Sequence, residues 1–174
     1  MKTLPLLALA AMIATAAPAF AHEDRMTLSG PEFAQQAAIG NNYEIWSSKL
    51  ALQRSRDPAV RNLAKHMIAD HMQAGKKLQA IVQSENADVR LNALDAEHQR
   101  MYDNLKATGA NSFNYQYVAD QAAAHASTIH LFEIYGKNGD DAALRNFALK
   151  TLPTLHHHQE MVQNVSMRPG YSWH

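Results

Sequence analysis

The chain contains no cysteine and only seven glycines among its 174 residues. Without cysteine it can form no disulfide, zinc–thiolate site or iron–sulfur cluster, and it has no thiol nucleophile and no cysteine for a lipid anchor. Lys plus Arg equals Asp plus Glu at 16 each, so the basic excess typical of nucleic-acid-binding proteins is missing. We therefore expect neither thiol chemistry nor a nucleic-acid partner.

The residues that are abundant favour helix. Hydrophobic residues make up 47% of the chain and charged residues 18%, which is typical of a globular protein with a proper core. Alanine, leucine, glutamine and methionine are frequent, and few glycines interrupt them. The ten histidines are many for this length and give the first sign of metal or acid–base chemistry.

Residues 1–21 have the form of a secretory signal peptide. Lys2 precedes an apolar stretch, and Ala19-Phe20-Ala21 is a small-x-small cleavage pattern followed by a polar segment. We expect cleavage after Ala21 and export to the bacterial periplasm. An uncleaved membrane anchor is the alternative, and it is disfavoured because the apolar stretch is short for a span of about 20 residues. No other segment of the sequence could span a membrane, so no stable span is expected after cleavage. Residues 22–28 and 166–174 are expected to be flexible. Cleavage after Ala21 leaves His22 at the N-terminus, where its amine and imidazole together can chelate copper. A frayed N-terminus without bound copper is the simpler interpretation.

Capping signals divide the rest into helices. Ser29 and Glu32 form a capping box, and Asp57-Pro58 ends one helix and begins the next. Pro153 lies inside the last segment, where it is expected to cause a kink. Residues 86–92 are expected to form a connection, and the predicted helices cover residues 29–54, 57–84, 95–108, 112–135 and 140–165.

Four of these helices are long and one is short. The first two long helices are joined tightly, as are the last two, and tight turns place consecutive helices antiparallel. The pattern predicts an all-α antiparallel four-helix bundle over residues 29–165. One extra short helix lies in the crossover between the second and third long helices.

Each long helix places one metal-ligand type of side chain on its apolar face. The second, third and last long helices carry His71, His125 and His158, and the first carries Glu44. Burying a lone carboxylate is costly unless it is paired or bound to a metal. Imidazole with carboxylate suits zinc, copper, iron or manganese, and bundle cores commonly hold such sites. These four residues are the candidate metal ligands.

A network of mutually hydrogen-bonded core residues is the alternative for the same four positions. One argument also opposes a compact site. Counted from the turn at Asn138, His125 lies 13 residues back and His158 lies 20 residues forward. At a rise of about 1.5 Å per residue, this difference predicts an offset of about 10 Å along the bundle.

Other polar groups give weaker signals. His66 and Asp70, four residues apart, are interpreted as a surface pair. His130 and Glu133 are a less favoured addition to the site, and His156 and His157 are expected to face solvent. No glycine-rich phosphate loop and no catalytic serine or zinc-protease motif occurs in the sequence.

The pattern resembles a bacterial domain-of-unknown-function family, DUF4142, which groups exported, ferritin-like proteins. The matching segments include residues 33–44, Val60 to His71 with its Asp-His pair, and Phe113-Asn114-Tyr115 followed by Ala124-His125. A Leu-Pro-x-Leu-x-x-His segment ending at His158 completes them. The family usually has an acidic residue where this chain has Asn114. The resemblance implies a ferritin-like bundle and no particular reaction. Because the chain has no Glu-x-x-His motif, a di-iron oxidase or an iron store is disfavoured.

Three functions remain open. The first is a periplasmic protein that binds, buffers or senses a divalent transition metal through Glu44, His71, His125 and His158. The second is a non-catalytic envelope protein, involved in interactions or stress, whose buried polar residues are structural and whose protein partner is unknown. The third, and least favoured, is a metal-assisted oxidase.

Overall fold

A computed structural model describes residues 28–168 of the chain, which form five α-helices and, within that range, no β-strand. The protein is therefore all-α, as the sequence predicted. The helices are α1 (Gly30–Arg54), α2 (Pro58–Ser84), α3 (Ala96–Ala107), α4 (Ala110–Asn138) and α5 (Ala142–Ser166). The predicted signal peptide, residues 22–27 and residues 169–174 lie outside the described residues. Among residues 28–168, no helix combines the length and apolar character needed to cross a bilayer.

The first three helices begin at the predicted caps, Ser29, Asp57 and Asp95. The Glu32 carboxylate accepts hydrogen bonds from the Ser29 backbone N–H at 2.9 Å and hydroxyl at 2.7 Å. Asp57 accepts from the Ala59 amide at 2.7 Å at the start of α2. These side chains satisfy backbone donors that have no partner within the helix.

Three helix ends differ from the sequence predictions. Helix α4 begins before the predicted Ser112 and continues beyond Tyr135 to Asn138. The N-cap of α5 is Asp141 instead of Asp140, because its carboxylate accepts a 2.7 Å bond from the Leu144 amide. The turn between α4 and α5 is therefore shorter and lies later in the chain than expected.

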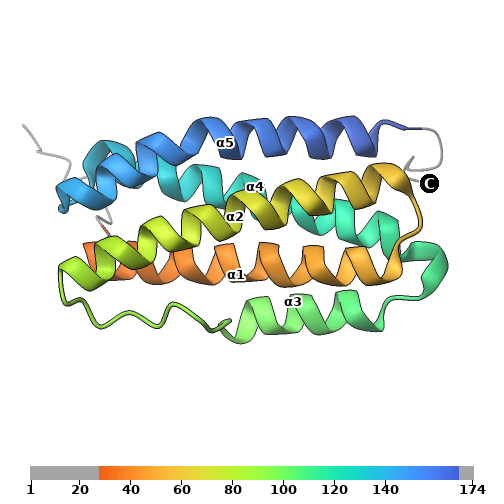
Figure 1. Cartoon of the computed structure of the whole chain (residues 1–174), viewed down its shortest axis with the longest axis horizontal. Coiled ribbons are helices and arrows are strands. Elements are labelled where there is room, and N and C mark those ends of the chain that lie inside the picture. The colour runs from red at the N-terminus through yellow and green to blue at the C-terminus, as the bar shows by residue number, and fades with distance from the viewer. Residues whose placement is uncertain (1–27, 169–174) are drawn as a thin grey trace, which may run out of the picture.

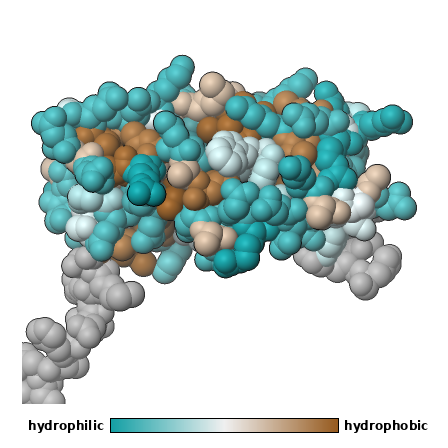
Figure 2. Space-filling view, turned by 90° about the horizontal axis from the view of Figure 1, so that it is seen from below, coloured by the Kyte–Doolittle hydropathy of each residue, from teal (hydrophilic) through white to brown (hydrophobic). Residues whose placement is uncertain are grey.

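The long helices pack side by side in two pairs (Figure 1). Helices α1 and α2 form one hairpin, α4 and α5 form the other, and α1 contacts α4 while α2 contacts α5. The connection after α2 returns along the outside of α1, where the Asn42 amide donates to the Leu91 carbonyl at 2.8 Å. Helix α3 then runs beside α1, and the Arg54 guanidinium donates to the Lys106 carbonyl at 2.8 Å near its end. On the face that carries α3, apolar patches show between hydrophilic side chains (Figure 2).

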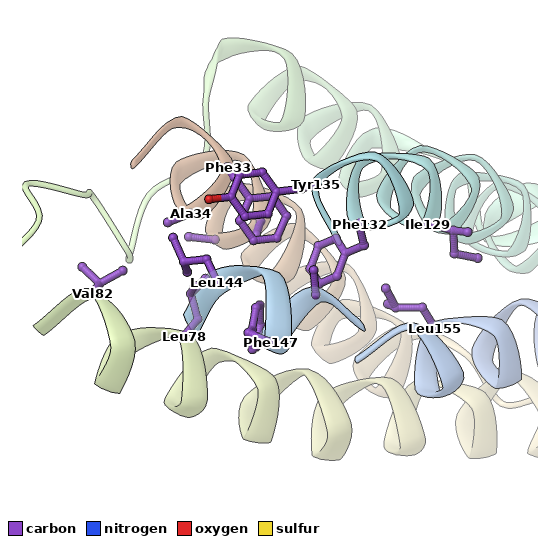
Figure 3. Packing of buried hydrophobic residues seen from close by; sticks show 13 residues of the cluster. Phe33, Ala34, Leu78, Val82, Ile129, Phe132, Tyr135, Leu144, Phe147 and Leu155 are labelled. Carbon is purple, nitrogen blue, oxygen red and sulfur yellow. The ribbon is translucent and has the colours of Figure 1, made fainter. Parts of the chain in front are cut away.

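Two apolar clusters fill opposite ends of the bundle. The first lies near the α4–α5 turn, where the ring of Phe33 stacks on Tyr135 at a centroid distance of 4.0 Å (Figure 3). The second lies near the α1–α2 turn and includes Met67, Phe113 and Val162. Polar side chains occupy the interior between them: Glu44, Ser47, Ser48, His71, Gln121, His125 and His158 are all buried. The candidate site lies in this polar layer.

Candidate metal centre

Three histidines meet in the centre of the bundle. His71 comes from α2, His125 from α4 and His158 from α5, and their exposed fractions are 5%, 1% and 1%. One ligand nitrogen from each ring lies within 4.8 Å of the other two. The closest pair, His125 Nε2 and His158 Nδ1, is 3.3 Å apart. The structure thus brings together three of the four residues that the sequence singled out.

The outer nitrogen of each ring has an acceptor of its own. His71 Nδ1 lies 3.2 Å from the Asn41 side-chain oxygen, and His125 Nδ1 lies 3.0 Å from the Gln121 carbonyl oxygen. His158 Nε2 lies 2.9 Å from an Asp70 carboxylate oxygen. All three atoms are acceptors, so each ring donates its N–H outward, and this fixes the tautomer of each neutral imidazole.

The three remaining nitrogens therefore carry lone pairs. These nitrogens are His71 Nε2, His125 Nε2 and His158 Nδ1, and His71 Nε2 has no hydrogen-bond partner. Burial lowers the pKa of His71 well below its usual range, lowers that of His125 to about 4, and lowers that of His158 despite the opposing Asp70 carboxylate. Each neutral ring has a single N–H, and that N–H points outward, so no proton lies between His125 Nε2 and His158 Nδ1 across their 3.3 Å contact. A cation would therefore be a suitable partner for the three lone pairs.

The donor set fits a transition-metal ion. Zinc binds imidazole nitrogen at about 2.0–2.1 Å, and tetrahedral geometry then separates two ligand nitrogens by about 3.3 Å. One of the three pairs, His125 and His158, has this spacing of 3.3 Å, and all three nitrogens lie within 4.8 Å of one another. Metal-bound histidines usually donate their other N–H to a carboxylate, a carbonyl or another acceptor, as all three rings do here.

Glu44 lies behind one of the rings and outside the triad. Its Oε1 atom is 3.4 Å from His125 Nδ1, the nitrogen on the outer side of that ring, and its side chain is 2% exposed. Neither carboxylate oxygen has a hydrogen-bond partner, and burial raises the pKa of Glu44 well above its usual range. The carboxyl group therefore stands next to the site as an acceptor that its surroundings do not satisfy.

More buried acceptors lie close to Glu44. Gln121 is fully buried, and its side-chain oxygen has no partner, although its amide nitrogen donates to the Ser47 hydroxyl at 3.1 Å. The hydroxyl oxygen of the fully buried Tyr43 also has no hydrogen-bond partner. The α1–α4 side of the site therefore carries several buried oxygen atoms that lack hydrogen-bond partners.

Two sequence-based interpretations of the site were wrong. The predicted offset of about 10 Å between His125 and His158 does not exist, since the two nitrogens are 3.3 Å apart. Counted from Asp140, the middle of the actual turn, the two positions differ by three residues, or about 4.5 Å of helix rise. Asp70, interpreted as a surface partner of His66, instead holds His158.

The sequence also missed two acceptors, Asn41 and the Gln121 carbonyl. The Gln121 carbonyl could have been predicted from spacing, because Gln121 precedes His125 by four residues, or about one helical turn, and a side chain can bond to the carbonyl one turn before it. The remaining candidates stay outside the triad. Glu133 pairs at 3.9 Å with His156, and His157, 64% exposed, faces solvent as expected.

Comparison with known proteins assigns the chain to a family. The model of the family described as a domain of unknown function, DUF4142, matches residues 15–165. The chain belongs to the DUF4142 family. No curated protein matches it. A crystal structure of a DUF305 fragment from Deinococcus radiodurans is similar over 76% of this chain and 91% of that one, with a TM-score of 0.67 and 14% identity. At this identity the likeness shows a shared helical fold and nothing about activity.

Proposed function

We propose that this DUF4142 protein is an exported periplasmic protein, built on a ferritin-like antiparallel bundle, that binds one divalent transition-metal ion through His71, His125 and His158. One observation carries the metal proposal: each ring donates its outer N–H to a separate acceptor, while the three remaining nitrogens converge within 4.8 Å. A core network held by hydrogen bonds alone would place a donor between two such nitrogens.

The chemistry of the donors restricts the ion. Three neutral imidazoles suit zinc, copper, iron or nickel better than the hard cations calcium and magnesium, which take oxygen ligands. Asp70 holds His158 in the tautomer that binds. The raised pKa of Glu44 favours its neutral form without an ion, and a cation on His125 would favour loss of that proton and leave compensating negative charge behind the ring. In this proposal Glu44 acts through His125, and the sequence-based prediction that it binds the ion directly stays a prediction.

Metal analysis of the purified protein tests the proposal. We expect about one equivalent of a transition metal per chain in the native protein, and a loss of most of it in His158→Ala. His157→Ala is the matched control, because this neighbouring histidine is 64% exposed and outside the triad. Circular dichroism confirms that each variant is helical. Equal metal content in both variants, or none in a folded native protein after exposure to zinc and copper, would overturn the proposal.

The localisation is tested separately. The charged start at Lys2, the apolar stretch and the Ala19-Phe20-Ala21 pattern support export with cleavage before His22. Periplasmic fractionation followed by N-terminal sequencing should give a chain that begins at His22. A cytoplasmic protein that retains residues 1–21 would contradict export and leave the metal proposal intact.

A further inference from the structure

The triad supplies three donors, and most ions that suit imidazole take at least four. Within residues 28–168, no fourth histidine or carboxylate joins His71, His125 and His158 as a ligand group. Sites in which a protein supplies three ligands keep the next position for water or another small molecule. The surroundings of the triad decide where such a molecule fits.

A small cavity borders His71, one of the three triad residues, on the side of the first apolar cluster. The His71 ring forms part of its wall, and all four long helices contribute to it. Ala74, Thr128 and Leu155 line it, and each lies three residues from a triad histidine on its own helix. These lining residues lie one helical turn from the histidines along the bundle axis. Phe132 and Leu155, which also line the cavity, are labelled in Figure 3.

The size and walls of the cavity define what it accepts. Room for water-sized molecules amounts to about 20 Å³, above the roughly 10–15 Å³ that one water needs. The walls are mostly apolar, and Asn41, Thr128 and Thr151 add polar atoms. The Thr151 hydroxyl donates to the Phe147 carbonyl at 2.7 Å, so it can only accept a hydrogen bond from a guest that donates, such as water. An anion would rely on the Asn41 amide or the Thr128 hydroxyl as donors. Such a space suits water, a halide or a small linear anion and excludes a ring.

A surface groove between α1 and α2 lies next to this cavity. The groove holds about 190 Å³ and shares Asn41, Gly75 and Leu78 with the cavity wall. Asn41 packs closely against Gly75 because glycine has no side chain: a Cβ atom at position 75 would lie 2.9 Å from the Asn41 side-chain nitrogen. The wall between groove and cavity is therefore thin and includes the side chain that holds His71.

We infer that the cavity beside His71 is the binding site for a small exogenous ligand of the metal ion, either water or a small inorganic anion. This inference rests on the proposed metal centre. The ligand reaches the ion through the α1–α2 groove, past Asn41. The site is thereby a centre with an exchangeable position instead of a closed structural one.

Cobalt-loaded protein titrated with azide, followed by visible absorption, tests the inference. Azide is expected to shift the cobalt bands of the native protein, and imidazole, which is too large for the cavity, to leave them unchanged. Ala74→Val fills the cavity and should weaken azide binding at least tenfold. Ala69→Val is the matched control, since Ala69 lies on the same helix and is exposed.

Each outcome has a definite meaning. If no cobalt spectrum appears in the native protein, the proposed function fails. If cobalt binds but azide changes nothing, or imidazole binds as well as azide, the cavity is not the ligand site and this inference alone fails. The imidazole comparison needs only the native protein, so it holds even where Ala74→Val does not fold. Equal azide affinity in a folded Ala74→Val and in Ala69→Val would also overturn the inference.

Discussion

Two buried polar groups lie next to each other in the bundle and differ in how their hydrogen bonds are satisfied. In the histidine triad, every ring N–H has an acceptor and the remaining lone pairs converge. In the group formed by Tyr43, Glu44 and Gln121, four oxygen atoms have no partner, and they share no such geometry. Both groups cost free energy to bury. Only the first is arranged as a set of ligands, and the second places a titratable carboxyl group beside it.

Removal of a triad histidine should have the largest effect. His158→Ala deletes a ligand nitrogen and the bond to Asp70, so zinc affinity should fall more than a hundredfold, beyond the 10–100-fold typical of indirect contacts. Competition with a chromogenic chelator measures it. A loss of less than tenfold would show that the two polar groups do not differ in function.

Removing the negative charge of Asp70, which accepts from His158, should lower zinc affinity less than removing the histidine. Asp70→Asn keeps an oxygen that accepts from His158 Nε2 but removes the carboxylate charge, so we expect zinc affinity to fall by about 10–100-fold. The same chelator competition applies, with Asp103→Asn on α3 as the control. An unchanged affinity would show that the Asp70 charge does not tune the site.

Glu44→Gln separates an indirect role from direct ligation. The substitution keeps the shape of the side chain and removes the buried carboxylate, so zinc affinity should fall about tenfold. The metal-free protein should become more stable in urea by about 1 kcal/mol, because an unsatisfied acid is replaced. If Glu44→Gln instead abolishes binding as fully as His158→Ala, Glu44 is a ligand.

The two groups should also oppose each other as pH changes in the metal-free protein. The lowered pKa values of the histidines mean that the unfolded chain binds more protons below pH 6.5, so stability is lost as pH falls from 6.5 towards about 4. The raised pKa of Glu44 has the opposite effect: the folded protein holds the Glu44 proton more tightly than the unfolded chain, so the free energy of unfolding falls as pH rises above 4.5. Urea unfolding at several pH values should therefore show a steeper rise of stability between pH 4.5 and 6.5 in Glu44→Gln, by on the order of 1 kcal/mol. Parallel profiles would show that Glu44 does not titrate in this range.

The smallest effect is expected at the wall of the cavity. In Gly75→Ala the new methyl group meets the Asn41 amide at 2.9 Å and displaces the acceptor of His71. Zinc affinity should fall by a few-fold, while helix propensity gains up to about 1 kcal/mol. Isothermal titration calorimetry and thermal melting measure the two changes. Higher zinc affinity in this variant would count against the role given to Asn41.

Sequence patterns were sufficient for the helices because caps and apolar periodicity are local. Asp57-Pro58 predicted a helix start at the right place, and the apolar faces identified His71, His125 and His158 as inward. Their meeting at one level was not predictable, because it depends on where the α4–α5 turn lies. The predicted turn was centred two residues too early, on Asn138 instead of Asp140. This error alone accounts for most of the predicted offset between His125 and His158 along the bundle.

The hydrogen-bond partners of the histidine rings could not be predicted from the sequence for a different reason. Asn41 and Asp70 are ordinary helix residues in the sequence, and their bonds to His71 and His158 depend on how α1 packs on α2 and α2 on α5. Glu44 was identified by the cost of burying a charge. Its position behind His125 instead of among the ligands depends on side-chain conformation, which periodicity does not encode.

All three ligand nitrogens come from the middles of rigid helices, and none comes from a loop. An ion held there ties α2 to the α4–α5 hairpin at the centre of the molecule. Breaking all three contacts with the ion would require packed helices to separate, so its residence time would depend on the opening rate of the bundle as well as on the affinity. If the ion binds as proposed, the protein would retain it through brief changes in the surrounding concentration and respond to sustained ones.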